Sequence, residues 1–490
     1  MGEREARRGI WEKLGLLAVL ILVLGAPVLG VLAVRWRISE FSAGKLPGVG
    51  RVAWVAEGRL WVKDLPDGKA RHLAAGENIS RPAWSPTGRW LLFRKGEELW
   101  LVGIDGGEAR RVAQGVREFA WSPAADVFAY TVTGKLLAVS PGSEKPGVLV
   151  KWEPGVDLGR IAWSPDGKWV AFEKQKIEPG APGYAGIWKV DAASGGVAPV
   201  YTSRLRFDRG VVGEVPRLAG WSSDGEMVIL WRGALSASIE ADGLPLGLAR
   251  ADGCEEPVPV VGKGWRGEIS LESAVLVRSG FIAAAPGKLA VIVGAGRETW
   301  VNKRLAVYDF RTGGLAFLTG TDQAAVDPAF SPDGKLLVYS AGPVLKDAGG
   351  DEATVRRALA GRKLWAVDTN GGQPRRLTND PAYHDERPLF TADGQQILFA
   401  RLDGENRTSL WLVRPDGSGL RQVVEKIGPL TGYYGAVAWD ELFAYWPGFT
   451  DTALIKAAKS TPEAKKFLAA KHIRDLTASL RFIDGEGRGW

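Results

Sequence analysis

Short apolar runs of three or four residues alternate with turn signals along most of the chain from Arg51 onward. The clearest example is Trp163–Lys168, Trp-Ser-Pro-Asp-Gly-Lys, which separates the apolar runs 160–163 and 169–172. Proline sets φ for the first corner of a turn, and Asp and Gly tolerate the left-handed conformation that completes it. The pattern therefore predicts a β-hairpin.

The same turn recurs along the chain, and a second turn of the Asp-Gly type follows most third apolar runs, for example at Asp309–Gly314. The first strands of the repeated units end at Trp84, Trp121, Trp163, Trp221, Ala285, Phe330 and Phe390. Four short strands per unit, repeated many times, are typical of a radially arranged all-β fold. We therefore predict a β-propeller.

The two ends of the repeat region determine the number of blades. Residues 51–73 supply the second, third and fourth strands of a unit that lacks a first strand, whereas Ala436–Trp439 has the pattern of a first strand alone. If these fragments pair, the ring closes by mixing the chain ends and has eight blades. Seven blades is the open alternative, because the units at Trp221 and Ala285 are the least regular.

The repeated Trp/Phe-Ser-Pro-Asp-Gly-Lys elements resemble the repeats of TolB-type, or WD40-like, β-propellers over about residues 51–447. That superfamily includes periplasmic scaffold proteins, lyases and the propellers attached to prolyl peptidases, so the resemblance implies a fold rather than one activity. A prolyl peptidase also needs an α/β-hydrolase domain with a Gly-x-Ser-x-Gly motif. We expect no such domain in residues 448–490.

Before the repeats, the chain has a short basic head (residues 1–13) and then Leu14–Val34, which contains no charged residue. A bilayer is spanned by about 20 apolar residues, so we predict a single transmembrane helix or uncleaved signal anchor. The alternative is a signal peptide cleaved near Ala33, but its apolar core would exceed the usual length of about 7 to 15 residues. Residues 35–50 form a predicted linker.

Basic residues on the two sides of this segment balance, so the positive-inside rule does not settle its orientation. We expect the propeller on the extracytoplasmic side of a bacterial cytoplasmic membrane, because a short head and a long trailing domain are common in tethered secreted domains. Beyond the repeats, Ser460–Glu463 is a capping box, and residues 448–490 are predicted to contain one or two short helices. A tail without packed helices is the alternative.

Composition excludes several classes of site. The single Cys254 precludes a disulfide within the chain, and the three His are far apart, so no zinc site is expected. We see no phosphate-binding or dinucleotide motif and expect no cofactor, no metal and no catalytic residue. The net charge of +7 comes without a polybasic run, so nucleic acid is not an expected partner.

The tight turns join first to second and third to fourth strands, whereas the long insertions join the other strand pairs. One face of the disc should therefore carry all the long connections, where binding usually resides. Candidate binding residues in these connections are Arg204, Arg206, Phe207, Arg209, Trp265, Arg266, Arg297, Trp300, Tyr383 and His384. Guanidinium and aromatic groups suit carboxylate, phosphate or sugar ligands. The alternative is that they only cover apolar surface.

Three other features are interpreted as structural. The regularly placed Trp residues of the first and third strands are expected to pack the core. The turn residues Asp166, Asp224, Asp333 and Asp393 are expected to form turns rather than bind metal. His384 and Asp385 are neighbours, but no nucleophile can be placed beside them.

These observations favour a non-catalytic, membrane-anchored scaffold that binds an envelope protein or peptide. The alternative is a carbohydrate-directed propeller, which would bind an anionic cell-wall polymer or act as a polysaccharide lyase.

Overall fold

The computed structural model describes residues 49–143, 145–177, 182–207, 211–233, 236–262, 273–345, 351–429 and 432–448. The chain divides into two units, Met1–Gly48 and Val49–Trp490, and every described residue belongs to the second. The predicted membrane segment Leu14–Val34 and the predicted C-terminal helices lie outside the described residues. Within the described ranges, no helix is long and apolar enough to cross a membrane.

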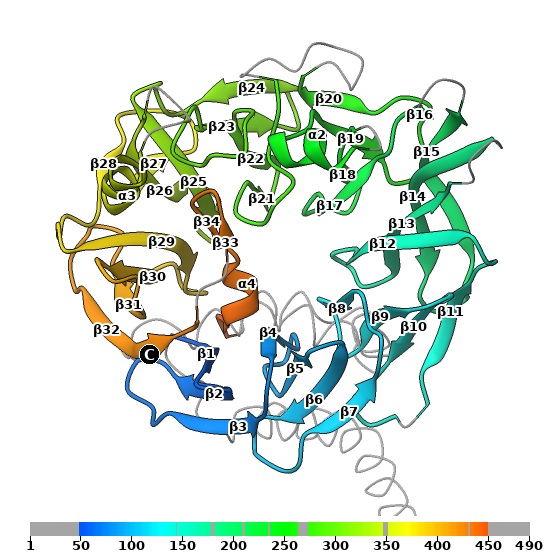
Figure 1. Ribbon diagram of the computed structural model, residues 1–490, viewed down its shortest axis with the longest axis horizontal. Helices are drawn as coiled ribbons and strands as arrows, with labels where there is room; N and C mark the ends of the chain where they lie inside the picture. Colours follow the sequence, from blue (N-terminus) through cyan, green and yellow to red (C-terminus); the bar gives the residue numbers. More distant parts are fainter. Residues whose placement is uncertain are drawn as a thin grey trace, which may run out of the picture. The chain divides into compact units, whose positions relative to one another are not determined.

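The second unit contains eight antiparallel sheets arranged as blades around a central channel (Figure 1). In each blade the strands follow one another from the channel to the rim. All seven first strands that the sequence predicted to end at a Trp, Phe or Ala are present. The prediction of an eight-bladed propeller is confirmed, and the seven-bladed alternative is wrong.

The blades have the following strands. Blade 1 contains β35 (Phe443–Trp446), β1 (Arg51–Ala56), β2 (Arg59–Asp64) and β3 (Arg71–Ala75). Blade 2 contains β4 (Ile79–Trp84), β5 (Trp90–Lys95), β6 (Glu98–Gly103) and β7 (Arg110–Ala113). Blade 3 contains β8 (Phe119–Trp121), β9 (Phe128–Val132), β10 (Lys135–Val139) and β11 (Gly147–Lys151). Blade 4 contains β12 (Val156–Trp163), β13 (Trp169–Lys176), β14 (Gly183–Asp191), β15 (Val197–Phe207) and β16 (Val211–Val212).

The remaining blades complete the ring. Blade 5 contains β17 (Arg217–Trp221), β18 (Met227–Trp231), β19 (Leu246–Arg250) and β20 (Val258–Val261). Blade 6 contains β21 (Ile282–Ala285), β22 (Lys288–Val293), β23 (Arg304–Asp309) and β24 (Gly314–Phe317). Blade 7 contains β25 (Gln323–Phe330), β26 (Leu336–Pro343), β27 (Lys363–Asp368) and β28 (Arg375–Arg376). Blade 8 contains β29 (Tyr383–Phe390), β30 (Ile397–Asp403), β31 (Thr408–Val413) and β32 (Arg421–Ile427).

The ring closes through the chain ends, but not through the residues that the sequence pattern indicated. The first strand of blade 1 is β35, which pairs with β1 so that Trp446 lies opposite Arg51. Ala436–Val437 instead forms β34 of a separate hairpin, and Trp439 begins the helix α4 (Trp439–Leu442). The repeated turn element of blade 1 is Tyr445-Trp446-Pro447-Gly448, in which Tyr445 and Trp446 stand where blades 2 to 5 have Trp and Ser.

A ladder of indole hydrogen bonds joins the first strands of neighbouring blades. Four tryptophans donate their Nε1–H to a backbone carbonyl of the preceding blade, at 3.0 to 3.1 Å: Trp84 to Ala444, Trp121 to Ala83, Trp163 to Ala120 and Trp221 to Ala162. Each acceptor residue directly precedes the aromatic residue near the end of its own blade's first strand. The same contact therefore recurs between successive blades. These tryptophans therefore register one blade against the next as well as packing the core.

The core lies within and between the blades, and the second strands are its most buried parts. Leu91, Leu92 and Phe93 of β5 are completely buried, as are Leu289, Ala290 and the rest of the middle of β22. Because both faces of these strands pack on neighbouring sheets, their sequences are continuous apolar runs rather than alternating ones.

The tight turns of the repeats are ordered by their own side chains. In the turn after β12, the Asp166 carboxylate accepts hydrogen bonds from Ser164 Oγ at 2.5 Å and Lys168 N at 3.0 Å. Asp224, Asp333 and Asp393 repeat this arrangement. The interpretation of these Asp residues as turn formers is therefore confirmed.

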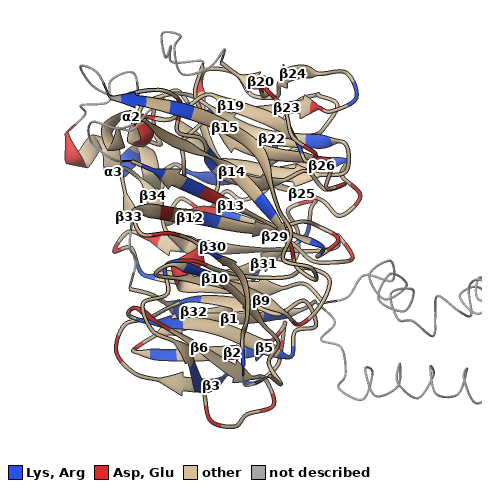
Figure 2. Ribbon diagram, turned by 90° about the vertical axis from the view of Figure 1, so that its right-hand side faces the viewer, with Lys and Arg blue, Asp and Glu red and all other residues tan. Residues whose placement is uncertain are grey.

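The other connections lie on the opposite face of the ring, which carries the helices α2 (Ala237–Asp242) and α3 (Glu352–Ala360) and the hairpin β33–β34 (Gly432–Tyr433 and Ala436–Val437). Figure 2 shows these elements gathered on the left side of the ring. We call this side the elaborated face. Two of the long connections that the sequence predicts, 174–186 and 202–217, are partly strand instead, because β13 continues to Lys176, β14 begins at Gly183 and β15 continues to Phe207.

Candidate functional site

A strap of residues 432–442, made of β33, β34 and α4, lies at the channel mouth on the elaborated face. It joins the outer strand of blade 8 to the closing strand β35 of blade 1, and its hairpin extends towards blades 6 and 7 (Figure 1). The two loop residues Tyr434 and Gly435 have φ of 54° and 73°. Positive φ at both positions is the geometry of a type I′ hairpin turn, which matches the twist of its strands.

The carbonyl groups at the tip of the strap are anchored to blades 6 and 7. Thr299 donates its backbone N–H to the Tyr434 carbonyl at 3.1 Å and its hydroxyl to the same carbonyl at 3.0 Å. Arg278 donates to the Tyr433 carbonyl at 3.2 Å, and Arg362 donates to that of Gly435 at 2.7 Å. The strap, which connects blades 8 and 1, is therefore anchored to two other blades, 6 and 7.

A buried ion pair lies beneath the strap. Arg362 and Glu386 are joined at 2.6 Å, and each side chain is at most 3% exposed. The indole of Trp439, at the start of α4, donates to the second oxygen of Glu386 at 3.2 Å. Because a buried charge is costly unless it is paired and hydrogen-bonded, this contact ties α4 to blade 8.

A second carboxyl group, Asp327 on β25, lies close to this ion pair. Its Oδ2 accepts the backbone N–H of Arg387 at 3.1 Å. Burial, together with the negative charge of Glu386, raises the pKa of Asp327 to about 7. Arg387 in turn pairs with Asp440 of α4 at 2.6 Å. The strap therefore contributes Asp440 to this ion pair, and its Trp439 contacts the pair of Arg362 and Glu386.

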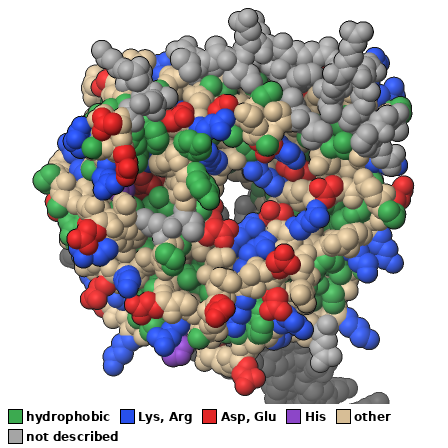
Figure 3. Space-filling view, in the orientation of Figure 1, with side chains coloured by type: hydrophobic (Ala, Val, Ile, Leu, Met, Phe, Trp, Pro, Cys, Tyr) green, Lys and Arg blue, Asp and Glu red, His purple; other side chains and the backbone are tan. Residues whose placement is uncertain are grey.

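The charged residues around the channel come from irregular positions in the first strands. Arg81, Asp327 and Arg387 each stand three residues before the aromatic end of a first strand, with φ between 52° and 55° and a shift of strand register. A bulge of this kind redirects a side chain out of the regular alternation. Arg81 also pairs with Glu118 at 2.7 Å, and Figure 3 shows charged side chains of both signs around the channel opening.

The predicted residues of blade 4 lie on a strand rather than on a loop. Arg204 and Arg206 are exposed on β15, on either side of the buried Leu205. The side chain of Phe207, and the whole of Arg209, Trp265 and Arg266, lie outside the part of the chain that the structure describes. Whether these residues bind a ligand stays a prediction.

Arg297 and Trp300 lie beside the strap. Arg297 forms a bidentate pair with Asp242 of α2, at 2.8 and 3.0 Å, and its guanidinium carbon lies 5.6 Å from the centre of the Tyr434 ring. Trp300 is 9% exposed, and its Nε1 has no hydrogen-bond partner in the described ranges. Trp300 therefore packs beneath the strap, whereas Arg297 borders its surface.

Tyr383 and His384 belong to blade 8 and do not form a catalytic pair with Asp385. Successive side chains of a strand point to opposite faces, so His384 and Asp385 diverge on β29. The Asp385 carboxylate instead binds the Arg401 guanidinium at 2.7 and 3.1 Å. Burial lowers the pKa of His384, and Tyr383 stacks over the same Arg401 at 5.0 Å.

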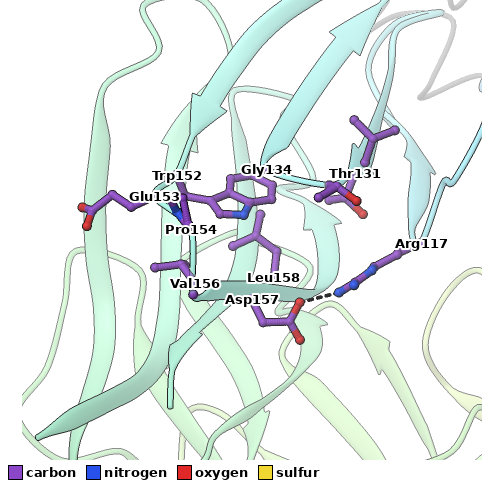
Figure 4. A pocket seen from close by; sticks show the side chains of 12 residues that line it. Arg117, Thr131, Gly134, Trp152, Glu153, Pro154, Val156, Asp157 and Leu158 are labelled. Carbon is purple, nitrogen blue, oxygen red and sulfur yellow. Dashed lines mark hydrogen bonds and ion pairs between the residues drawn. The ribbon is translucent and has the colours of Figure 1, made fainter. Parts of the chain in front are cut away.

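A pocket of about 280 Å³ opens between blades 3 and 4 on the elaborated face. Trp152, Val156 and Leu158 form its apolar part, and an ion pair between Arg117 and Asp157 borders it (Figure 4). Its volume is just below the usual range for small-molecule sites, so it fits one side chain or sugar ring. Among the described residues, no group of three or more His, Cys, Asp or Glu could hold a metal ion.

Sequence reasoning missed the strap, its anchors and this pocket. The available signal was Gly432-Tyr433-Tyr434-Gly435, whose paired glycines and aromatics between two short apolar runs suggest a hairpin. Because Ala436–Trp439 resembles a first strand, that signal was assigned to the ring instead. Nothing in the local sequence of Arg278 or Arg362 indicates that they contact residues so distant in the chain.

Comparisons with known proteins support the fold. No family model matches the sequence. A segment of 102 residues, 21% of this chain, is 32% identical to the uncharacterized peptidase YuxL of Bacillus subtilis (strain 168), of which it covers 13%. The chain therefore matches a small part of that protein.

Two solved structures are similar to this chain to different degrees. Dipeptidyl peptidase 4 of Porphyromonas gingivalis is 11% identical with a TM-score of 0.50, over 84% of this chain and 65% of that chain. TolB of Acinetobacter baumannii is 17% identical with a TM-score of 0.32, over 78% of this chain and 66% of that chain. The eight sheets make the protein an eight-bladed β-propeller. TolB and dipeptidyl peptidase propellers are among its structural neighbours, and likeness at these identities concerns the fold alone.

Proposed function

We propose that this propeller is a non-catalytic scaffold that binds a protein or peptide at the channel mouth of its elaborated face. The observation that carries the proposal is the strap tip, where Tyr433 is 80% exposed although its backbone is anchored by Arg278. An exposed aromatic residue on a rigid support is the kind of side chain that contributes most to protein interfaces, because little conformational entropy is lost on binding.

The distribution of charge around the strap supports the same conclusion. Arg297, Arg387 and Arg217 are already paired with Asp242, Asp440 and Glu240. Paired charges of both signs favour a partner with mixed character over a uniformly anionic polymer.

Site-specific photo-crosslinking in intact cells tests this proposal. Tyr433 is replaced by p-benzoylphenylalanine, and Phe317 serves as the matched control because it is an exposed aromatic residue, 39% accessible, on the outer strand β24. We expect a discrete protein adduct from position 433 and none from position 317. The adduct is identified by mass spectrometry and the complex is reconstituted from purified components.

Either of two results would contradict the proposal. No adduct at position 433 would show that the strap does not meet a protein. The same adducts from both positions would show non-specific contact with the envelope.

We further propose that the propeller lies on the extracytoplasmic side of a bacterial cytoplasmic membrane, anchored through Leu14–Val34. The support is the uncharged apolar segment, which is long enough to span a bilayer. Protease added to intact spheroplasts should degrade the propeller, whereas a cytoplasmic marker should survive. Protection of the propeller until the spheroplasts are lysed would contradict this location.

The pocket beside Trp152 favours a second candidate function, a carbohydrate-directed propeller. An indole face flanked by an ion pair suits the apolar face and hydroxyl groups of a sugar ring. Binding of cell-wall oligosaccharides that is lost in Trp152→Ala would support this function. Retention of that binding in the variant would contradict it.

A further inference from the structure

Arg278 stands out among the arginines near the channel because no carboxylate pairs with it in the described part of the chain. It is half-buried, and its guanidinium donates to the carbonyl of Tyr433. By contrast, the buried Arg232 and Arg362 each have a carboxylate partner within 2.8 Å. A neutral carbonyl satisfies one N–H of the five that a guanidinium carries, so Arg278 retains donors for which the described ranges supply no anionic acceptor.

Two further arginines contact the surroundings of Arg278. Arg160 donates to the carbonyl of Val277, the preceding residue, at 3.3 Å, and it also has no ion pair in the described ranges. Arg297 borders the same strap tip. Burial and the positive charge of Arg297 lower the pKa of Arg278, and the smaller effects of Tyr434 and Glu298 raise it. Because Asp242 already pairs with Arg297, the positive charge at the strap tip that lacks a direct carboxylate partner in the described ranges is that of Arg278, which is partly shielded from water.

The strap tip carries two exposed aromatic residues, and Tyr433 is the most exposed large hydrophobic residue of the described chain. Tyr433 is 80% and Tyr434 is 45% accessible. They follow one another in the chain, and Arg278 and Arg297 contact one each. A surface that combines unpaired guanidinium donors with aromatic rings suits a carboxylate flanked by an apolar group.

We propose that Arg278, Tyr433 and Tyr434 form a recognition site for a carboxylate side chain, or a terminal carboxylate, next to an apolar residue in a peptide segment of the partner. Arg278 would supply the two parallel N–H donors of a bidentate contact, and the tyrosine rings would cover the apolar neighbour. This inference rests on the proposed peptide-binding function and specifies its chemistry.

The surroundings favour an acidic peptide over a polyanionic polysaccharide. Asp242 and Glu298 lie within the same surface region. Asp242 pairs with Arg297, and the negative charge of Glu298 raises the pKa of Arg278. A polymer with a negative charge on every unit would bring further charges close to these carboxylates, which is unfavourable. A single carboxylate followed by uncharged residues avoids that repulsion.

Selection from a random peptide library displayed on phage tests the inference, with full-length protein in detergent micelles as the target. We expect peptides in which Asp or Glu adjoins an apolar residue. Synthetic copies of these peptides should bind at least about tenfold more weakly when the acid is replaced by its amide, because a charge-assisted contact is lost. Arg278→Gln should abolish that difference, whereas Arg311→Gln, an exposed arginine in a tight turn on the other face, should preserve it.

A structural effect of losing Arg278 can be distinguished from a loss of recognition. Tyr433→Ala keeps the carbonyl that Arg278 contacts, so this variant should weaken binding through the lost ring while the acid-to-amide difference persists. A loosened strap alone would instead reduce binding of the acidic and amide peptides equally in Arg278→Gln, and that result would overturn the inference.

Further outcomes are decisive as well. Selected peptides without acidic residues, or no selected peptides, would refute the carboxylate site, and a crosslinked protein at position 433 would then still support the broader function. Oligogalacturonate that binds in an Arg278-dependent way, without binding of acidic peptides, would assign the site to polysaccharide instead. Inorganic phosphate at low concentration should not inhibit peptide binding in the wild type or in Arg278→Gln, because it should not occupy a site built for one carboxylate. Inhibition of the wild type that Arg278→Gln removes would instead indicate a general anion site and overturn the inference.

Discussion

The indole N–H of Trp84 donates to the backbone carbonyl of Ala444 at 3.1 Å, across a separation of 360 residues. The bond joins blade 2 to the strand that returns from the far end of the repeats. Trp121 makes the same contact with Ala83 inside the ring, at 3.0 Å. Ring closure therefore uses the same contact that registers consecutive blades.

This equivalence predicts the effect of removing one donor. Trp84→Phe retains a large ring but loses the hydrogen bond to Ala444, and we expect the free energy of unfolding to fall by about 1 kcal/mol. Trp121→Phe should have a similar effect because its geometry is the same. Urea denaturation measures both values, and an unchanged stability of Trp84→Phe alone would show that this bond contributes nothing to closure.

The strap tip depends on a glycine that has no room for a side chain. At Gly435, with φ of 73°, an added Cβ would lie 2.6 Å from the Thr299 hydroxyl oxygen and 2.9 Å from Leu359. Gly287 has the same φ with no atom within 4 Å. Gly287→Ala should cost the usual penalty of about 1 to 2 kcal/mol for this backbone conformation, and Gly435→Ala should cost more.

Hydrogen exchange locates that additional cost. Gly435→Ala should speed exchange of the Thr299 amide, which donates to Tyr434 in the strap, whereas Gly287→Ala should leave it unchanged. Equal destabilisation by both variants, with no change at Thr299, would contradict the predicted crowding.

The buried Asp327 predicts a stability that falls as pH rises. Its pKa is raised to about 7 in the folded protein, above its value of about 3.9 in the unfolded chain. Between these two values the folded protein binds the proton more tightly, so the free energy of unfolding decreases as pH rises from about 4 to about 7. Asp327→Asn should remove this component of the pH dependence.

Denaturation at about pH 5 and at about pH 8 tests the contribution of Asp327. The difference in unfolding free energy between the two conditions should shrink in Asp327→Asn. Asp333→Asn is the control, because the hydrogen bond from Ser331 lowers the pKa of Asp333 and its ionisation is complete at both pH values. An unaltered difference in Asp327→Asn would mean that Asp327 is charged in the folded protein throughout this range.

The fully buried pair of Arg401 and Asp385 should be sensitive to loss of either partner. The two side chains are 1% and 0% exposed. Removing one leaves an unpaired buried charge, so Arg401→Met should destabilise the protein by about 3 to 5 kcal/mol. The double variant Arg401→Met, Asp385→Leu should lose less than the sum of the single variants, since no uncompensated charge remains.

A neighbouring exposed pair serves as the control for this double-mutant cycle. Arg407 pairs with Asp403 at 2.7 Å, but its side chain is 71% exposed. Water solvates the two groups when the pair is broken, so Arg407→Met should have little effect on stability. Additive effects of the Arg401 and Asp385 substitutions would contradict the account of a coupled buried pair.

Local features of the sequence were sufficient to predict the blades. The turn at Ser164–Gly167 is formed by hydrogen bonds over two to five residues, so its signal is complete within the segment that folds. The same holds for the first strands ending at Trp84 and Phe390. The pairing of the chain ends also followed from counting strands, although the closing strand was misplaced by several residues.

The candidate site could not be predicted in the same way, because its contacts join residues far apart in the chain. Arg278 and Tyr433 are 155 residues apart, and Arg362 and Thr299 are 63 apart. Such pairs have no local pattern, since an arginine that binds a distant carbonyl looks like any exposed arginine. His384 and Asp385 illustrate the converse, because neighbours in the sequence point to opposite faces of a strand.

The amino-acid sequence by itself determined the repeated hairpins and the size of each blade, and it favoured eight units over seven, because these depend on short-range turn chemistry and on the period of apolar residues. Only the tertiary structure decided which strand closes the ring, where the strap lies and which charges are paired. Those outcomes depend on how the blades bring distant backbone carbonyls and side chains together, and closure of the ring sets that arrangement.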